Sequence, residues 1–329
     1  NSDAMNSEFD QIALARGGYI LRPDLLDLGY SDRQIRQALR AGLIVRLRVG
    51  TYAPQSHTLL TPEDRYRLLC YSVLDKLPSG VVLSHESAAA IHTGVAWGFD
   101  TRVVHVTRLD GNGQRSESGV NHHSGYLPES DIMQIDGRPI IVAGRAALES
   151  TSSAGTEAGM IQTSLVIRGG VNSDELHDRL SRMRRWPGFN AVRLATLWAA
   201  PECESVGEIR SVHMFRRTGL PIPRMQVEFR NPHKRSTARV DFDWPDFHHC
   251  GEFDGLIKYG RLNPYSTSMA GQILVEEKLR EDSIREIPRG MSRWIYQDLR
   301  TPELTTRRIR AAMEQSRRLF GRPTVAVIA

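Results

Sequence analysis

The chain of 329 residues is 40% apolar and 25% charged, with a formal net charge of +5 at pH 7. This composition excludes an intrinsically disordered protein, and because no apolar run reaches the roughly 18 residues of a membrane span, a membrane protein is excluded as well. We expect a cytoplasmic α/β protein of the α+β multidomain kind, with three reduced cysteines and with residues 1–4 left over from cloning.

Residues 5–56 have the pattern of three short helices followed by a β-hairpin. An apolar repeat marks the first helix, a proline opens the second and a serine begins the third: Phe9, Ile12 and Leu14, then Pro23, then Ser31. Gln34 stands three residues after Ser31, which is the spacing of a capping box. Apolar residues then alternate with Arg46 and Arg48 before the turn at Gly50, as in a hairpin. This order of elements predicts a winged helix-turn-helix.

The third predicted helix has an apolar face and a cationic face. Ile35, Ala38 and Leu39 recur at helical spacing and are expected to face the core. The opposite face and the hairpin carry the candidate DNA-binding residues, which are Arg33, Arg36, Gln37, Arg40, Arg46 and Arg48. We expect the helix to reach base edges in the major groove and the hairpin arginines to contact phosphates. The alternative is a solvated face in a chain that uses 39 arginines and only four lysines.

Residues 57–200 are expected to form an α+β middle domain. Helices and strands are predicted at 61–74, 84–91, 103–106, 140–142 and from 145 onward. His85 and Glu86 suggest a zinc protease motif, but its second histidine would stand at the position of Ala89. We therefore expect these residues and the pair His122 and His123 to be structural, and this domain shows no recognisable chemistry.

Residues 201–329 carry acidic residues at regular places. A helix that begins with Ser205 and Glu208 precedes strands at 225–229, 239–244 and 248–255, a charged helix at 272–287, a strand at 293–296 and a basic helix from 302. Strand periodicity places Asp241 and Asp243 on the same face of their strand, and Glu252 and Asp254 likewise share a face of theirs.

Glu208, Asp241 and Glu252 are the candidate catalytic acids, because carboxylates that converge from neighbouring strands repel unless a cation lies between them. Asp241 and Glu252 would hold Mg²⁺, which can activate a water and neutralise a phosphodiester. Lys258 is the candidate catalytic cation, and Asp254 and Lys278 would support the site. The plainer alternatives are that Glu208 only caps its helix, that Asp241 and Glu252 are exposed acids, and that Lys278 pairs with an acid on its own helix.

The first two predicted domains resemble the AbiEi-type antitoxins of type IV toxin–antitoxin systems. The matching stretches are 18–20, 28–31, 41–46, 50–52 and 83–89, and the likeness extends over residues 8–170. The resemblance implies a winged-helix DNA binder that represses its own operon and is paired with a nucleotidyltransferase-like toxin. Glu149 stands where an aspartate is expected from this family.

The third predicted domain resembles the very-short-patch-repair-type branch of PD-(D/E)xK endonucleases over residues 202–300. The matching positions are 208–210, 219–221, Gln226, 240–242, 244–245, 251–255, 277–278 and 280–282. The resemblance assigns the acidic roles to Glu208, Asp241 and Glu252. The lysine of the motif should follow Glu252 by two residues, where Asp254 stands. Either the cation has moved to Lys258, or the fold persists as an inactive binding module.

Three functions therefore stay open. The chain is a DNA-binding regulator with a nuclease-like domain, a nicking or repair endonuclease directed by its winged helix, or a module whose inactive nuclease fold binds a protein. The expected partners are DNA and a nucleotidyltransferase-like toxin, with no membrane, and Mg²⁺ is the expected cofactor of an active nuclease.

Overall fold

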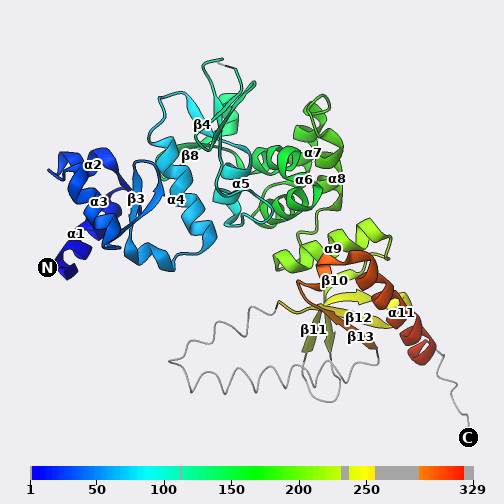
Figure 1. Ribbon diagram of the computed structural model, residues 1–329. Helices are drawn as coiled ribbons and strands as arrows, with labels where there is room; N and C mark the ends of the chain where they lie inside the picture. The colour runs from blue at the N-terminus through cyan, green and yellow to red at the C-terminus, as the bar shows by residue number, and fades with distance from the viewer. Residues whose placement is uncertain (1, 112, 231–236, 256–288, 322–329) are drawn as a thin grey trace, which may run out of the picture. The chain divides into compact units, whose positions relative to one another are not determined.

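The computed structural model describes residues 2–111, 113–230, 237–255 and 289–321 (Figure 1). The chain divides into two compact units, Asn1–Thr196 (unit 1) and Leu197–Ala329 (unit 2), each with helices and sheet. None of the helices in these described ranges combines the length and the apolar character needed to cross a bilayer. The mixed α and β content agrees with the expected class.

Unit 1 begins with the expected helices and hairpin. Its first elements are α1 (Ser2–Ala15), β1 (Ile20–Leu21), α2 (Arg22–Asp27), α3 (Asp32–Arg40), β2 (Ile44–Arg48) and β3 (Thr51–Pro54). The three strands form an antiparallel sheet in the order β1-β3-β2, and β1 was not predicted. The capping box is confirmed, because Ser31 Oγ accepts from the Gln34 N–H and Gln34 Oε1 accepts from the Ser31 N–H at 2.8 Å.

A small core lies beneath α1 and α3. Ile35 and Ala38 are buried as expected, together with Phe9. Leu14 is 80% exposed although it belongs to the apolar pattern that predicts the first helix, whereas Ala13 is only 1% exposed. Ala13 lies four residues after Phe9 and so shares its helix face, whereas Leu14 is rotated past it.

The rest of unit 1 is a mixed sheet with helices. Its elements are α4 (Pro62–Leu74), β4 (Val81–Leu83), α5 (His85–Thr93), β5 (Val104–Arg108), β6 (Arg115–Glu117), β7 (Val120–Ser124), β8 (Ile132–Ile135), β9 (Arg138–Ile141), α6 (Ala143–Arg168), α7 (Ser173–Arg182) and α8 (Phe189–Trp198). The described strands follow the order β6-β7-β5-β4-β9-β8. The pairs β4–β9 and β5–β7 are parallel, so partners far apart in sequence become neighbours.

The segment around β1 shares one hydrophobic core with α4 and the middle sheet. Tyr19 and Leu21 are buried in the same cluster as Tyr66, Leu68 and Val82. Arg138 donates to the Tyr19 hydroxyl at 2.8 Å and to Asp75, and its guanidinium lies over the Tyr71 ring. Residues 5–56 are therefore packed as part of unit 1.

In the described part of unit 2, two helices pack on a sheet. Its elements are α9 (Val206–Thr218), β10 (Arg224–Arg230), β11 (Thr237–Trp244), β12 (His249–Phe253), β13 (Gly290–Trp294) and α11 (Pro302–Phe320). The described strands follow the order β10-β11-β12-β13, with only the last pair parallel. Phe215 of α9 meets Phe242, Trp244 and Trp294 edge to face, which joins helix and sheet. The last strand lies earlier than the predicted 293–296, and the predicted helix at 272–287 lies outside the described residues.

Candidate nucleic-acid interface and acidic cluster

The outer face of α3 is cationic and open to solvent. Arg33, Arg36, Gln37 and Arg40 are all exposed, while Ile35 is buried on the opposite side. The start of α3 is held by a two-pronged ion pair, in which Arg22 of α2 donates to both carboxylate oxygens of Asp32 at 2.9 and 2.7 Å. This ion pair is solvent-exposed and links α3 to α2, while Ile35 and Ala38 pack the inner face of α3 into the core.

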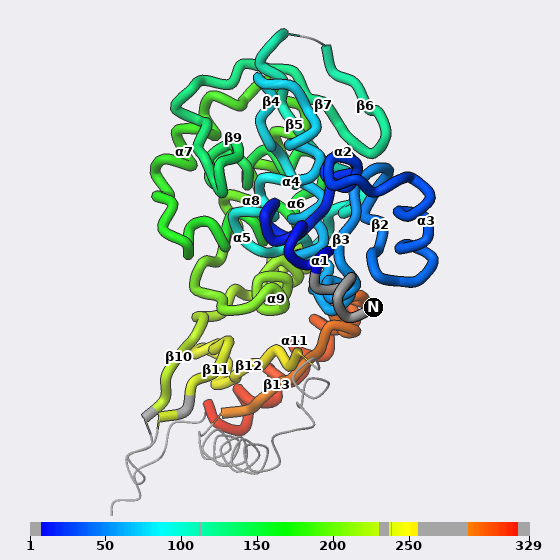
Figure 2. Tube along the Cα trace, turned by 90° about the vertical axis from the view of Figure 1, so that its left-hand side faces the viewer, coloured from blue at the N-terminus to red at the C-terminus, as the bar shows by residue number. Residues whose placement is uncertain are grey.

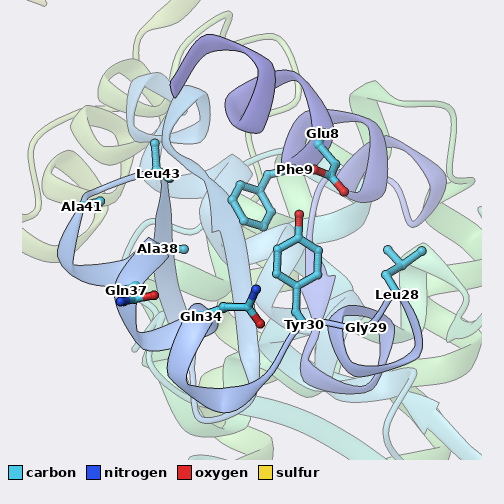
Figure 3. A pocket seen from close by; sticks show the side chains of 10 residues that line it. All are labelled: Glu8, Phe9, Leu28, Gly29, Tyr30, Gln34, Gln37, Ala38, Ala41 and Leu43. Carbon is cyan, nitrogen blue, oxygen red and sulfur yellow. The ribbon is translucent and has the colours of Figure 1, made fainter. Parts of the chain in front are cut away.

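A hollow of about 540 Å³ lies beside this face (Figure 3). It is bounded by α1, the α2–α3 turn and one edge of α3, and the Phe9 and Tyr30 rings line it. Gln34 and Gln37 lie at its rim. Among the four candidate residues of α3, Gln37 is thus the one that borders the hollow.

The two hairpin arginines differ in their surroundings. Arg46 is exposed, whereas Arg48 is half-buried and burial lowers its pKa from the ordinary value. A guanidinium nitrogen of Arg48 donates to the Ser118 carbonyl at 3.0 Å, in the turn between β6 and β7. Figure 2 shows this β6–β7 hairpin near the end of β2, where the bond is made. Arg46 is the better placed of the two for an incoming phosphate.

In unit 2, Glu208 is held at the first turn of α9. Its carboxylate accepts from the Ser205 hydroxyl at 2.6 Å and from the Glu204 N–H at 2.8 Å, and the residue is 7% exposed. The N-cap that the spacing predicts is present, since Ser205 Oγ accepts from the Glu208 N–H at 3.2 Å, but the Glu208 carboxylate accepts from the Glu204 N–H in place of the Ser205 N–H of a full capping box. Glu208 also has a partner that the spacing does not predict.

That partner is Gln226, which joins two of the predicted acids. Its Nε2 lies 2.8 Å from Glu208 Oε2 and 3.5 Å from Asp241 Oδ1. Gln226 has a left-handed φ of 53° inside β10, at the point where the register sets it opposite Asp241. Its Oε1 is buried and has no hydrogen-bond partner within the described ranges.

Asp241 and Glu252 lie on neighbouring strands. The register pairs Phe242 with Gly251, so its continuation sets Asp241 beside Glu252. Asp241 Oδ2 accepts from the Phe253 N–H at 2.9 Å, and Glu252 accepts from Arg293 Nε at 2.9 Å. Sequence reasoning missed Arg293, since only the parallel pairing of β12 with β13 brings it to Glu252.

Of the remaining predicted site residues in unit 2, only Asp254 is among the described residues. The N–H of Asp254 donates to the Trp294 carbonyl, while Lys258 and Lys278 lie outside the described residues. In the part of the chain that is described, no three His, Cys, Asp or Glu side chains are placed to hold a metal ion. The described acids therefore do not by themselves form a three-ligand Mg²⁺ site.

Unit 1 holds a cluster of three imidazoles that sequence reasoning missed. His85 of α5 stacks on His123 of β7 with centroids 3.6 Å apart, and His105 of β5 lies 5.2 Å from His123. His105 Nδ1 is 3.0 Å from His123 Nε2 and 3.1 Å from Glu86 Oε2. The parallel pairing of β5 with β7 makes this cluster, and only the strand position of His105 hinted at it.

Burial governs the protonation of this cluster. It lowers the pKa of His85 and of His123 to about 3, and it raises the pKa of Glu149. Glu149 is 2% exposed, accepts from Arg145 Nε at 2.6 Å and lies 3.2 Å from His85 Nδ1. The imidazoles are therefore neutral at pH 7 and pack as uncharged rings.

The segment that contains α3 and the β2–β3 hairpin matches a family of known proteins. Residues 10–55 match the family described as transcriptional regulator, AbiEi antitoxin. The match begins in α1 and ends just after β3, and it supports a role as a DNA-binding regulator. No curated protein matches the chain.

Proposed function

We propose that the chain is a DNA-binding transcriptional regulator that resembles a type IV antitoxin, and that residues 5–56 are a winged helix-turn-helix. The observation that carries this proposal is the exposed arginine face on a capped and anchored α3. Arg33, Arg36 and Gln37 would contact base edges. The match of residues 10–55 to AbiEi antitoxin regulators supports the same function.

In this proposal the remaining contacts go to phosphates. Arg40 lies in the last turn of α3 and Arg46 on the exposed side of β2, so both can approach the DNA backbone. Arg48 is assigned to a phosphate as well, through the guanidinium N–H groups that do not serve Ser118.

The test compares two triple variants of equal charge in the full chain. Arg33→Ala/Arg36→Ala/Arg40→Ala removes the α3 face, and Arg182→Ala/Arg184→Ala/Arg185→Ala removes three exposed arginines elsewhere in unit 1. DNA affinity is measured by fluorescence anisotropy on sequences selected from a random library. We expect the DNA affinity of the first variant to fall at least about tenfold, which is the loss expected for a single base contact, and the second variant to bind like wild type. Equal losses in both variants would contradict an α3-centred interface.

We further propose a nucleotidyltransferase-like toxin as the protein partner. The support is the antitoxin description of the family that matches residues 10–55. The test is co-purification of the full chain with the product of a neighbouring nucleotidyltransferase-like gene, followed by light scattering. A stable complex supports the partner, and separate elution of the two proteins contradicts it.

A metal-dependent endonuclease is the second candidate function. In this proposal Glu208, Asp241, Glu252 and Lys258 are catalytic, and Asp241 and Glu252 would hold Mg²⁺. The observation in its favour is that one amide, that of Gln226, reaches both Glu208 and Asp241. The test is cleavage of plasmid and oligonucleotide DNA with Mg²⁺ or Mn²⁺ against EDTA, with Asp241→Asn as the inactive control.

The alternative for unit 2 is an inactive nuclease fold that binds a protein. The ion pair of Glu252 with Arg293 supports it, because a guanidinium supplies counter-charge without a metal. If DNA is cleaved with neither Mg²⁺ nor Mn²⁺, the result contradicts the endonuclease and supports the inactive fold.

A further inference from the structure

The turn of the β2–β3 hairpin is held by a lysine from outside residues 5–56. Lys76 follows α4, and its Nζ donates to the Gly50 carbonyl at 2.9 Å, to the Val49 carbonyl at 3.2 Å and to Thr51 Oγ1 at 2.6 Å. An ammonium group has three N–H donors, and here each of them has an acceptor. Lys76 is one of only four lysines in the chain, and its ammonium is fully engaged by the hairpin turn.

The hairpin turn has further restraints on either side. The Gly50 carbonyl also accepts from the Arg22 N–H at 3.0 Å, and Arg48 donates to the Ser118 carbonyl. Gly50 has a left-handed φ of 68°, and a Cβ at this position would lie 3.4 Å from Lys76 Nζ. The turn is therefore fitted to the ammonium group.

β3 is the buried central strand of the β1-β3-β2 sheet, so the sheet holds the base of the hairpin, and only its tip depends on further contacts. Val49 at the tip is 84% exposed and gives the turn no apolar anchor, whereas Thr51 is fully buried next to the lysine. The restraint on the tip of the hairpin is thus polar, and Lys76 supplies most of it.

We propose that Lys76 is a positioning residue for DNA binding, which fixes the hairpin so that Arg46 meets a phosphate while Lys76 itself does not touch the DNA. This inference rests on the proposed DNA-binding function. A cation near a DNA interface can either contact a phosphate or position another residue. Lys76 has the second role, because its three N–H groups are engaged and none is left for a phosphate.

The test is a double-mutant cycle in the full chain with Lys76→Met, Arg46→Ala and the double variant. The probe is a mixed-sequence duplex of about 20 base pairs, two helical turns, titrated at several salt concentrations. We expect each single variant to weaken binding about three- to tenfold, and the double variant to bind no worse than Arg46→Ala alone, because Lys76 acts through Arg46. Arg185→Met removes an exposed charge elsewhere in unit 1 and is expected to bind like wild type.

Losses that multiply in the double variant would overturn the inference, since they would show that Lys76 contacts DNA independently. Wild-type affinity in a folded Lys76→Met protein would overturn it as well. Thr51→Val removes one of the three acceptors and leaves the lysine in place, and it is expected to give a smaller loss that also disappears beside Arg46→Ala. A wild type that does not bind DNA would overturn the proposed function, and this inference with it, whereas an effect of Arg46→Ala without any effect of Lys76→Met would overturn the inference alone.

Discussion

The imidazole rings of His85 and His123 lie stacked, with their centroids 3.6 Å apart and their planes 15° from parallel. This contact joins the start of α5 to β7, and Glu149 and Arg145 of α6 lie beside it. Burial lowers the pKa of both imidazoles to about 3, so the stack exists in its uncharged form.

The free energy of unfolding should therefore fall as the pH drops below about 6.5, the ordinary pKa of histidine. Between that value and the lowered folded pKa, the unfolded chain binds more protons than the folded one, so acid favours unfolding. Each such histidine contributes at most about 1.4 kcal/mol per pH unit. Glu149 works in the opposite direction because burial raises its pKa, and it offsets part of the slope.

Melting temperatures between about pH 5 and 8 measure this dependence, in the range where histidine titrates. His123→Phe retains a flat ring for the stack but cannot be protonated, and we expect a shallower pH dependence than in wild type. His177→Phe on α7 changes an exposed histidine and should retain the wild-type slope. Equal slopes in wild type and His123→Phe would contradict the role of the stack.

The second prediction concerns the cap of α3. Ser31→Ala removes the hydroxyl that accepts from the Gln34 N–H, so we expect a loss of about 0.5–2 kcal/mol in the free energy of unfolding. Ser31→Asn retains a capping oxygen and should lie close to wild type. Denaturant unfolding of the three proteins checks this, and a Ser31→Ala protein as stable as wild type would show that the cap is dispensable.

The third prediction separates base contacts from phosphate contacts. Arg36→Ala should lose about 1–3 kcal/mol on the preferred sequence and relax the preference at one position. Arg46→Ala should weaken all sequences alike and reduce the salt slope of log K by about 0.9. Binding isotherms on selected and scrambled duplexes at several salt concentrations distinguish the two, and the same behaviour in both variants would refute the assignment.

The fourth prediction uses the amide between two acids in unit 2. Gln226→Glu replaces the Nε2 donor to Glu208 and Asp241 with a third carboxylate, so like-charge repulsion should lower the melting temperature at pH 7.5. Relative to wild type at the same pH, acidification to about pH 5 should recover part of this loss as one carboxyl group takes up a proton. Gln226→Met has similar length without charge and should show no such recovery.

Mg²⁺ gives the same variant a second readout. If Asp241 and Glu252 can hold the ion, Mg²⁺ should raise the melting temperature of wild type and of Gln226→Glu, because a ligand selective for the folded state stabilises it. Asp241→Asn should lose that response. No shift with Mg²⁺ in wild type, together with no DNA cleavage, would favour the inactive fold.

The sequence by itself determined the local elements. The Ser31–Gln34 box, the buried stripe of Ile35 and Ala38 and the Ser205 cap of α9 were all predictable. Each depends on residues three or four apart on one helix, and that distance is set by helix geometry alone. The apolar pattern of the first helix did not reveal which of two adjacent side chains faces the core, because one residue's difference turns a side chain to another side of the helix: Ala13 is buried and Leu14 is exposed.

Tertiary structure alone decided which distant residues meet. His105 reaches His123 only because β5 pairs in parallel with β7, and Arg293 reaches Glu252 only because β13 joins β12. Lys76 reaches Gly50 because residues 5–56 share a core with the middle sheet. Strand partners and register come from the packing of whole apolar faces, which no local spacing encodes. For this reason the residues that hold the β2–β3 hairpin and those that surround Asp241 and Glu252 became visible only in the folded chain.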